Sequence, residues 1–415
     1  MSTTFAEALV PLSARMPRAV REHEVLRVAG WLPGNDPDAV ARKATAEVLK
    51  WGQRQAGTGL PPAAWEGETF DLPLPGRDPS AVRLRSGASD LWAFRINRPD
   101  SDVPGRVWTT EVVLGHLPES PARFSVRLLV ATNEAELSIT PAVPALIRHV
   151  ARKCGLMVGG QRATLAPMEY RTRDEAEALV DHLLDQDRVL PTFVLTSFEE
   201  TFSPPPIDPS ELNKAVLGLA HVAFAHGDAC WLLTERFGKR LSVFGGAVRV
   251  YVPGFDAAAD PFAHRLVLPA TLGSGDGVER TVRWLRETAA KVSLHRTRLG
   301  GEVLPYAAVR TASLELRQAK LREARASETD QLAAALEQIN ALQGQIEALK
   351  LEQVYYIGEY ERERERAEAA EAQAQKAAWR IQQLSEQIRA EDGDPDSGSA
   401  LPSAWTEFVE WCDEQ

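Results

Sequence analysis

The densest group of side chains that could carry chemistry lies in the stretch AVRVYVPGFDAAADPFAH. Arg249 and Tyr251 alternate with valines, so they share one face of a predicted strand and could bind a phosphate group. Carboxylates and an imidazole follow in the loop beyond that strand, where such groups could hold a metal ion or transfer a proton. We therefore predict Arg249 and Tyr251 as ligand-binding residues, and Asp256, Asp260 and His264 as candidate catalytic residues.

Two glycine-rich stretches could instead cradle a phosphate. Gly245 and Gly246 separate the apolar runs LSVF and AVRVYV, and a glycine pair between two strands favours a two-residue hairpin over a phosphate loop. Gly273, Gly275 and Gly277 fit neither the dinucleotide-binding nor the P-loop spacing. We predict a strand-to-helix loop there, with Asp276 as the helix N-cap.

A metal-dependent nuclease is the main enzymatic alternative, because such a centre needs two or three carboxylates at the ends of adjacent strands. The acids that could supply them are Glu66, Glu68, Glu111, Asp256 and Asp260, but their spacing matches no nuclease motif. The eight histidines are scattered, and neither H-E-x-x-H nor G-x-S-x-G occurs. We therefore predict no metal site from sequence motifs, and the sequence identifies no cofactor.

The distribution of charge separates the C-terminal part of the chain from the rest. The 415 residues carry a net charge of −11, and residues 313–415 alone hold 22 acidic and 11 basic side chains. In residues 1–312 the acidic and basic side chains are equal in number. This part of the chain, here called the body, therefore lacks the net positive charge of a non-specific nucleic-acid binder. Nucleic acid as a partner is therefore unsupported by charge.

The cysteine content and the hydropathy pattern bear on location. Cys154, Cys230 and Cys412 are few and far apart, which argues against a disulfide framework and favours a reducing cytoplasm. The N-terminus lacks the apolar core of a signal peptide. No apolar run reaches the roughly 20 residues that span a bilayer. We expect a cytoplasmic protein without a membrane partner.

The pattern of apolar residues predicts a mixed α/β and α+β fold. We predict a helical segment over residues 1–60, a strand-rich α+β unit over 61–160 and an α/β unit over 161–312. The second unit would hold an antiparallel meander formed by AVRLRSG, LWAFRINRPD, VWTTEVVLGHL and RFSVRLLVAT. The third alternates strands and helices, as a partly parallel sheet requires.

A heptad repeat indicates a coiled coil over residues 313–390, which we predict as one long helix from about Leu314. Apolar residues recur in alternating steps of three and four. The main seam residues are Leu332, Ile339, Leu342, Ile346, Leu349, Ile381, Leu384 and Ile388. A single charged helix is the alternative around EYERERERAEAAEAQAQKAA. The partner of the seam would be a second copy, another protein, or the body of the same chain.

The last residues read as a linker followed by a short helix. Residues 391–402 are acidic and rich in Gly, Ser and Pro, as in a flexible linker. Residues 403–415 place aromatic side chains at helical spacing, and we predict a docking helix for a protein partner. Its contact residues would be Trp405, Phe408 and Trp411.

Four stretches resemble an uncharacterised family of large bacterial coiled-coil proteins of the actinobacterial type. They are DLWAFRINRPDSDVPGRVWTTEVVLG, LPTFVLTS, ACWLLTERFGKRLSVFGGAVRVYVPGFD and LPSAWTEFVEWCDEQ. Members of that family resemble proteins encoded beside phage-defence genes. The family has no assigned catalytic residues, so the resemblance implies none here. It also implies that SAWTEFVEWCDEQ begins a further domain.

Together these observations favour an interaction or scaffold protein. A coiled coil would serve self-association or partner binding, in a bacterial antiphage defence system according to the resemblance. The alternative is a metal-dependent nuclease or a nucleotide-processing enzyme with its site in the α/β unit.

Overall fold

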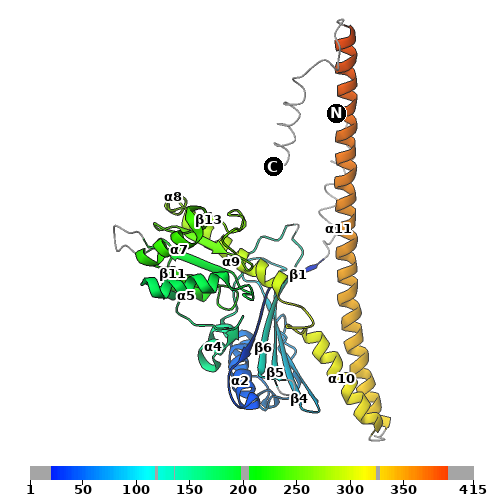
Figure 1. Cartoon of the computed structure of the whole chain (residues 1–415). Coiled ribbons are helices and arrows are strands. Elements are labelled where there is room, and N and C mark those ends of the chain that lie inside the picture. The colour runs from blue at the N-terminus through cyan, green and yellow to red at the C-terminus, as the bar shows by residue number, and fades with distance from the viewer. Residues whose placement is uncertain (1–19, 117–119, 135, 198–204, 324–327, 391–415) are drawn as a thin grey trace. The chain divides into compact units, whose positions relative to one another are not determined.

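The computed structural model describes residues 20–116, 120–134, 136–197, 205–323 and 328–390 (Figure 1). The chain divides into two compact units, Met1–Leu351 and Glu352–Gln415. Both sheets belong to the first unit, and the described part of the second is the continuation of one helix. The predicted linker over 391–402 and the docking helix over 403–415 lie outside the described residues.

The first sheet has eight antiparallel strands. Its order is β2 (Phe70–Asp71), β3 (Ser80–Ser86), β4 (Ser89–Pro99), β5 (Val107–His116), β6 (Ala122–Thr132), β1 (Arg21–Leu32), β7 (Met157–Val158) and β8 (Gln161–Arg162). Strands β3 to β6 form the meander that the sequence predicts, and each pairs with the next along the chain. The short turns between period-two runs were sufficient to indicate this arrangement.

The prediction of a helical segment over residues 1–60 is wrong for its first described part. Strand β1 pairs with β6 along its whole length, from Arg21 opposite Thr132 to Leu32 opposite Ala122. Its register shifts between Glu24 and Leu26, which breaks the period-two pattern and hides the strand in the sequence. The predicted helix begins only afterwards, as α2 (Pro37–Ala56).

Helix α2 covers one face of the first sheet. The Asp36 side chain caps it by accepting from the Ala39 amide at 3.0 Å, and Gly57 ends it at a φ of 72°. Its buried Val48 and Leu49 share a core with apolar residues that alternate along β4. The short helix α3 (Pro62–Trp65) follows α2.

The second sheet has five strands and mixed direction. Its order is β13 (Leu266–Val267), β12 (Val248–Tyr251), β10 (Thr192–Thr196), β11 (His221–Ala225) and β9 (Met168–Tyr170). Strands β9, β11 and β10 are parallel, whereas β12 and β13 are antiparallel. This confirms the prediction of a partly parallel sheet built from alternating strands and helices.

Helices cover both faces of the second sheet. Side chains of α5 (Arg173–Leu184) and α7 (Gly227–Leu241) form a core on one face. Side chains of α6 (Pro209–Ala215) and α9 (Gly277–Arg296) join the larger core on the other face. Helix α5 begins with a capping box between Thr172 and Glu175.

The hairpin predicted at Gly245 and Gly246 is wrong, although the glycines do form a turn. Both have positive φ, 62° and 79°, and the Ala247 amide donates to the Phe244 carbonyl across the turn. No strand precedes the turn, because α7 continues through a kink at Gly238 and takes up Leu241. Strand β12 therefore pairs with β10 and β13 instead.

The predicted loop before α9 contains the short helix α8 (Pro269–Leu272). Asp276 occupies the N-cap of α9, as predicted, but its side chain makes no capping hydrogen bond and instead pairs with Arg280. A Cβ on Gly277 would lie 1.9 Å from the Thr271 carbonyl oxygen. The close approach of α8 therefore accounts for glycine at this position.

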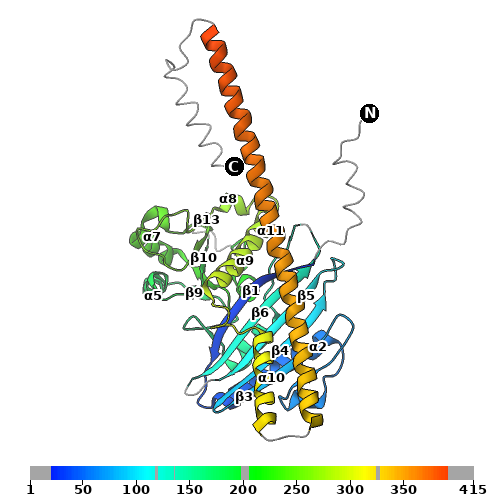
Figure 2. The same ribbon diagram turned by 90° about the vertical axis from the view of Figure 1, so that its right-hand side faces the viewer.

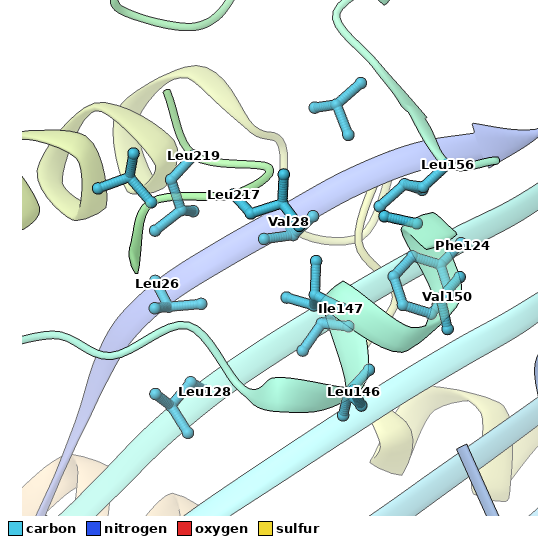
Figure 3. Close-up of a cluster of buried hydrophobic side chains, with 14 of the residues drawn as sticks. Leu26, Val28, Phe124, Leu128, Leu146, Ile147, Val150, Leu156, Leu217 and Leu219 are labelled. Carbon is cyan, nitrogen blue, oxygen red and sulfur yellow. The ribbon is translucent and has the colours of Figure 1, made fainter. Parts of the chain in front are cut away.

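Helix α4 (Ala145–Cys154) joins the two sheets into one hydrophobic core. Figure 3 shows Val28 of β1 between Ile147 of α4 and Leu217, which precedes β11. A Cβ on Gly218 would approach Val28 to 3.1 Å, so the two parts are in close contact there. The core thus continues across the boundary at residue 160 that separates two of the predicted domains.

The C-terminal helix predicted from about Leu314 consists of two helices, α10 (Tyr306–Glu323) and α11 (Glu328–Ala390). Helices α2 and α10 lie on opposite faces of the first sheet (Figures 1 and 2). None of the helices in the described ranges is long and apolar enough to cross a lipid bilayer.

We expect Ile147→Ala to lower the free energy of unfolding by about 2–5 kcal/mol, because it leaves a cavity at a fully buried junction. Chemical denaturation followed by circular dichroism measures the loss. Arg152→Ala, at an exposed position of the same helix, should change stability by no more than about 0.5 kcal/mol. Equal effects of the two substitutions would contradict this account of the junction.

Candidate functional site

Arg249 and Tyr251, the predicted ligand-binding pair, lie inside the α/β part and not on an open polar face. Both are buried, and both contact the C-terminal end of α7. Arg249 Nη2 donates to the Arg240 carbonyl at 2.7 Å, and the Tyr251 hydroxyl donates to the Leu241 carbonyl at 2.7 Å. These carbonyls have no partner within the helix, so the two side chains act as its C-terminal cap.

The candidate catalytic residues are divided between a turn and the core. Asp256 and Asp260 are exposed, and each accepts a backbone hydrogen bond from the residue two positions later, at 2.7 and 3.0 Å. His264 is buried, accepts from the Val252 amide at 3.2 Å and packs edge-on against Phe255. Burial, with Arg188 and Arg249 nearby, lowers its pKa.

The other acids of the predicted nuclease do not join them. Glu68 pairs with Arg85 at the surface of the first sheet, and Glu66 ends α3. Glu111 is buried on the sheet face that α10 covers. The described residues contain no cluster of three or more His, Cys, Asp or Glu side chains that could hold a metal ion. The catalytic and ligand-binding roles therefore stay predictions.

A buried polar cluster that the sequence did not indicate lies at the start of β10. His182 Nδ1 accepts from the Gln161 amide at 2.7 Å, and His182 Nε2 donates to the Thr192 hydroxyl at 2.9 Å. This arrangement requires a neutral imidazole. The ring of His221 packs edge-on against His182 at 5.1 Å. Desolvation, reinforced by Arg188, lowers the pKa of His182 to about 4.

Arg188 connects this cluster to the second sheet through hydrogen bonds. It is buried and donates to the carbonyls of Leu183, Leu190, Tyr251 and Val252 at 2.9–3.3 Å. Leu183 lies in the last turn of α5, so Arg188 caps that helix as Arg249 caps α7. Loss of hydration lowers the pKa of Arg188 to about 10, which leaves the guanidinium charged at neutral pH.

A row of charged side chains crosses the face of the first sheet opposite α2. Arg95, Glu111, Arg127 and Arg27 are cross-strand neighbours on β4, β5, β6 and β1. Glu24 accepts from Arg127 at 2.6 Å and also pairs with Arg27. One charge in the middle of each apolar strand was the available signal, and it was visible in LWAFRIN, VWTTEVVL and RFSVRLLV.

This row positions α10. The Glu111 carboxylate accepts from the Tyr306 amide at 3.2 Å, at the first residue of α10, where a negative charge is favourable. Tyr306 and Val309 then pack on Val82, Ala93 and Val113 of the sheet. A hydrogen bond from the Ser313 hydroxyl to the Arg83 carbonyl at 3.0 Å holds the next turns.

Helix α11 begins next to α10, and the face of α11 that contacts α10 is not the face that bears the heptad seam. Gln345 donates to the Thr311 hydroxyl at 2.5 Å, and Arg317 pairs with Glu337 at 2.8 Å. Ala334 is buried on this side. The side chains that α10 covers thus occupy heptad positions outside the seam.

The described seam residues remain open to solvent in the single chain. Between 43% and 52% of the surface is exposed in Ile339, Leu342, Ile346, Ile381 and Leu384. The side chains of Leu332, Leu349 and Ile388 lie outside the described residues, as do Trp405, Phe408 and Trp411. Two groups of half-exposed seam residues are therefore described on α11, one at Ile339, Leu342 and Ile346 and the other at Ile381 and Leu384.

Stability should fall as the pH is lowered from about 6.5 towards 4. His182 and His221 have folded-state pKa values of about 4 and about 3, below the ordinary histidine value, so the unfolded chain binds protons first in this window. Urea denaturation across the window measures the slope. His182→Gln should reduce the loss of unfolding free energy across this pH window by about 2 kcal/mol. His295→Gln, at an exposed position, should leave that loss unchanged. An unchanged slope in both variants would contradict the neutral cluster.

Comparison of the chain with protein-family models, with curated proteins and with solved structures found no match.

Proposed function

We propose that the protein is a self-associating interaction protein whose α11 helices pair through the heptad seam. The observation that carries this proposal is the half-exposed stripe of leucine and isoleucine side chains that α10 leaves uncovered. Completing the burial of each such side chain contributes roughly 1 kcal/mol. Two groups of such side chains, at 339–346 and at 381–384, on each of two chains therefore favour pairing over solvation.

The chemistry of the seam favours a second copy in parallel orientation. In the heptad register, Ile339, Ile346 and Ile381 occupy position a, and Leu342 and Leu384 occupy position d. Isoleucine at a with leucine at d is the combination preferred by parallel two-stranded coils. A hairpin back onto the body would not use this pattern, and α10 already occupies another face of α11.

The flanking charges agree with that orientation. Arg366 occupies a g position and Glu371 the following e position, so opposite charges would face each other between two parallel chains. This pair lies where the seam is made of alanines, Ala370 and Ala374, and contributes little apolar area. Charge pairing would therefore support the weakest part of the coil.

The part of the chain that holds both sheets, here called the head (residues 20–323), would then be present in two copies at one end of the paired helices. Helix α10 connects the first sheet to α11 through Tyr306 and Val309, so the start of the coil is fixed to the body by packed side chains. No contact among the described residues favours the nuclease alternative. The defence role implied by the resemblance also stays a prediction.

We expect the full chain to have about twice its monomer mass of 45.6 kDa by light scattering at micromolar concentration. The double substitution Ile339→Asp and Ile346→Asp should shift it to monomer, because two charges per chain would be buried in the seam. The circular dichroism of the head should be retained.

The matched control adds two acids to outward positions of the same turns, Asn340→Asp and Gly344→Asp, both exposed. This variant should keep the dimer mass. A monomeric parent chain, or loss of the dimer in the control alone, would rule out pairing through the seam.

A further inference from the structure

A cleft of about 420 Å³ lies between α2, the start of α4 and the inner strands β4, β5 and β6 of the first sheet. Trp51 of α2 and Trp108 of β5 supply aromatic walls, and Arg98 of β4 and Arg148 of α4 lie at the same cleft. Neither the coiled coil nor the predicted site residues take part in it. The volume is within the range of about 300–1,000 Å³ that small-molecule sites occupy.

The aromatic side of the cleft is held in place before any ligand arrives. Trp51 is only 6% exposed and belongs to the hydrophobic core. Trp108 packs against that core, and its Nε1 donates to Asp100 Oδ2 at 2.6 Å. Flat ring faces fixed in this way are suited to contact with a planar ligand ring.

The other side of the cleft carries positive charge. Arg98 and Arg148 are exposed, and Arg148 lies in the first turn of α4. That turn has no acidic residue and no side-chain cap, so the positive end of the helix is not neutralised there. After desolvation, Arg54, Arg152 and Arg148 lower the pKa of the adjacent His149, which is consistent with a local excess of cations.

Two acidic residues, Asp100 and Asp102, also line the cleft, and they differ in how far they offset the positive charge of the arginines. Asp100 is engaged by the amides of Asp102 and Val103, by Trp108 and by Arg106, so its charge is balanced within the protein. Asp102 is exposed at the cleft and opposes the arginines. Removing its charge should therefore strengthen the binding of an anion.

We propose that this cleft binds a nucleoside monophosphate or a ligand of the same chemistry, a flat heteroaromatic ring joined to a phosphate. The ring lies against Trp51 and Trp108, and the phosphate meets Arg98, Arg148 and the start of α4. The site is independent of self-association, so dimer and monomer both bind.

Isothermal titration of the full chain with AMP, GMP, CMP and UMP tests the proposal. We expect a dissociation constant below about 1 mM for at least one of them, together with a change in tryptophan fluorescence. The matching nucleoside and inorganic phosphate, titrated separately, should each bind at least tenfold more weakly, since each lacks one half of the contacts. Absence of binding by all four nucleotides overturns the proposal, and so does equal binding of phosphate alone.

Single substitutions locate the bound nucleotide. Arg148→Gln and Arg98→Gln should each weaken binding about tenfold, and Asp102→Asn should tighten it a few-fold. Arg152→Gln is the matched control, because this exposed arginine lies one turn further along α4 and outside the cleft lining. Equal weakening by Arg152→Gln and Arg148→Gln, or no response to Arg98→Gln and Arg148→Gln, would show a non-specific charge effect and overturn the assignment.

Discussion

The proposed pairing depends on one constraint, which is that α10 leaves the apolar side chains Ile339, Leu342 and Ile346 of α11 uncovered. Helix α10 is fixed to the first sheet by Tyr306 and Val309, and its other contacts reach the side of α11 that bears Ala334 and Gln345. A helix can pack only a limited arc against one neighbour. The fixed position of α10 leaves Ile339, Leu342 and Ile346 about half exposed, and the proposed pairing with a second helix would cover them.

In the first unit, arginines that are buried or half-buried donate hydrogen bonds to backbone carbonyls at helix ends. Arg27 donates to the Leu294 and Thr297 carbonyls at the end of α9, Arg188 caps α5 and Arg249 caps α7. Helix ends carry unpaired carbonyls and partial negative charge, so a guanidinium there can satisfy backbone acceptors. Arg27 and Arg188 each donate to more than one carbonyl, whereas Arg249 donates to one, and its Nε and Nη1 are buried without a hydrogen-bond partner among the described residues. An arginine inside an apolar strand has the same appearance in a sequence whether it binds a ligand or a helix end, so the sequence alone could not indicate that Arg249 contacts the end of α7.

Local patterns predicted the parts of the fold that local chemistry determines. The meander of β3 to β6 and the partly parallel second sheet follow from the short-range alternation of apolar residues and from the order of strands and helices. Strand β1 was missed because its bulge breaks the alternation and its pairing with β6 spans about a hundred residues. The cleft at Trp51 and Arg148 could not be predicted either, since only the fold brings α2, α4 and β5 together.

Disulfide capture at one seam position tests the central claim most directly. A chain carrying Leu384→Cys and Cys412→Ser should form a covalent dimer under mild oxidation, because position d faces its own copy in a parallel, in-register pair. The native Cys154 and Cys230 are buried and should not react. The same background with Gln375→Cys, at an exposed outward position, should remain a monomer on a denaturing gel. No covalent dimer at position 384, or equal capture at both positions, would contradict the parallel seam.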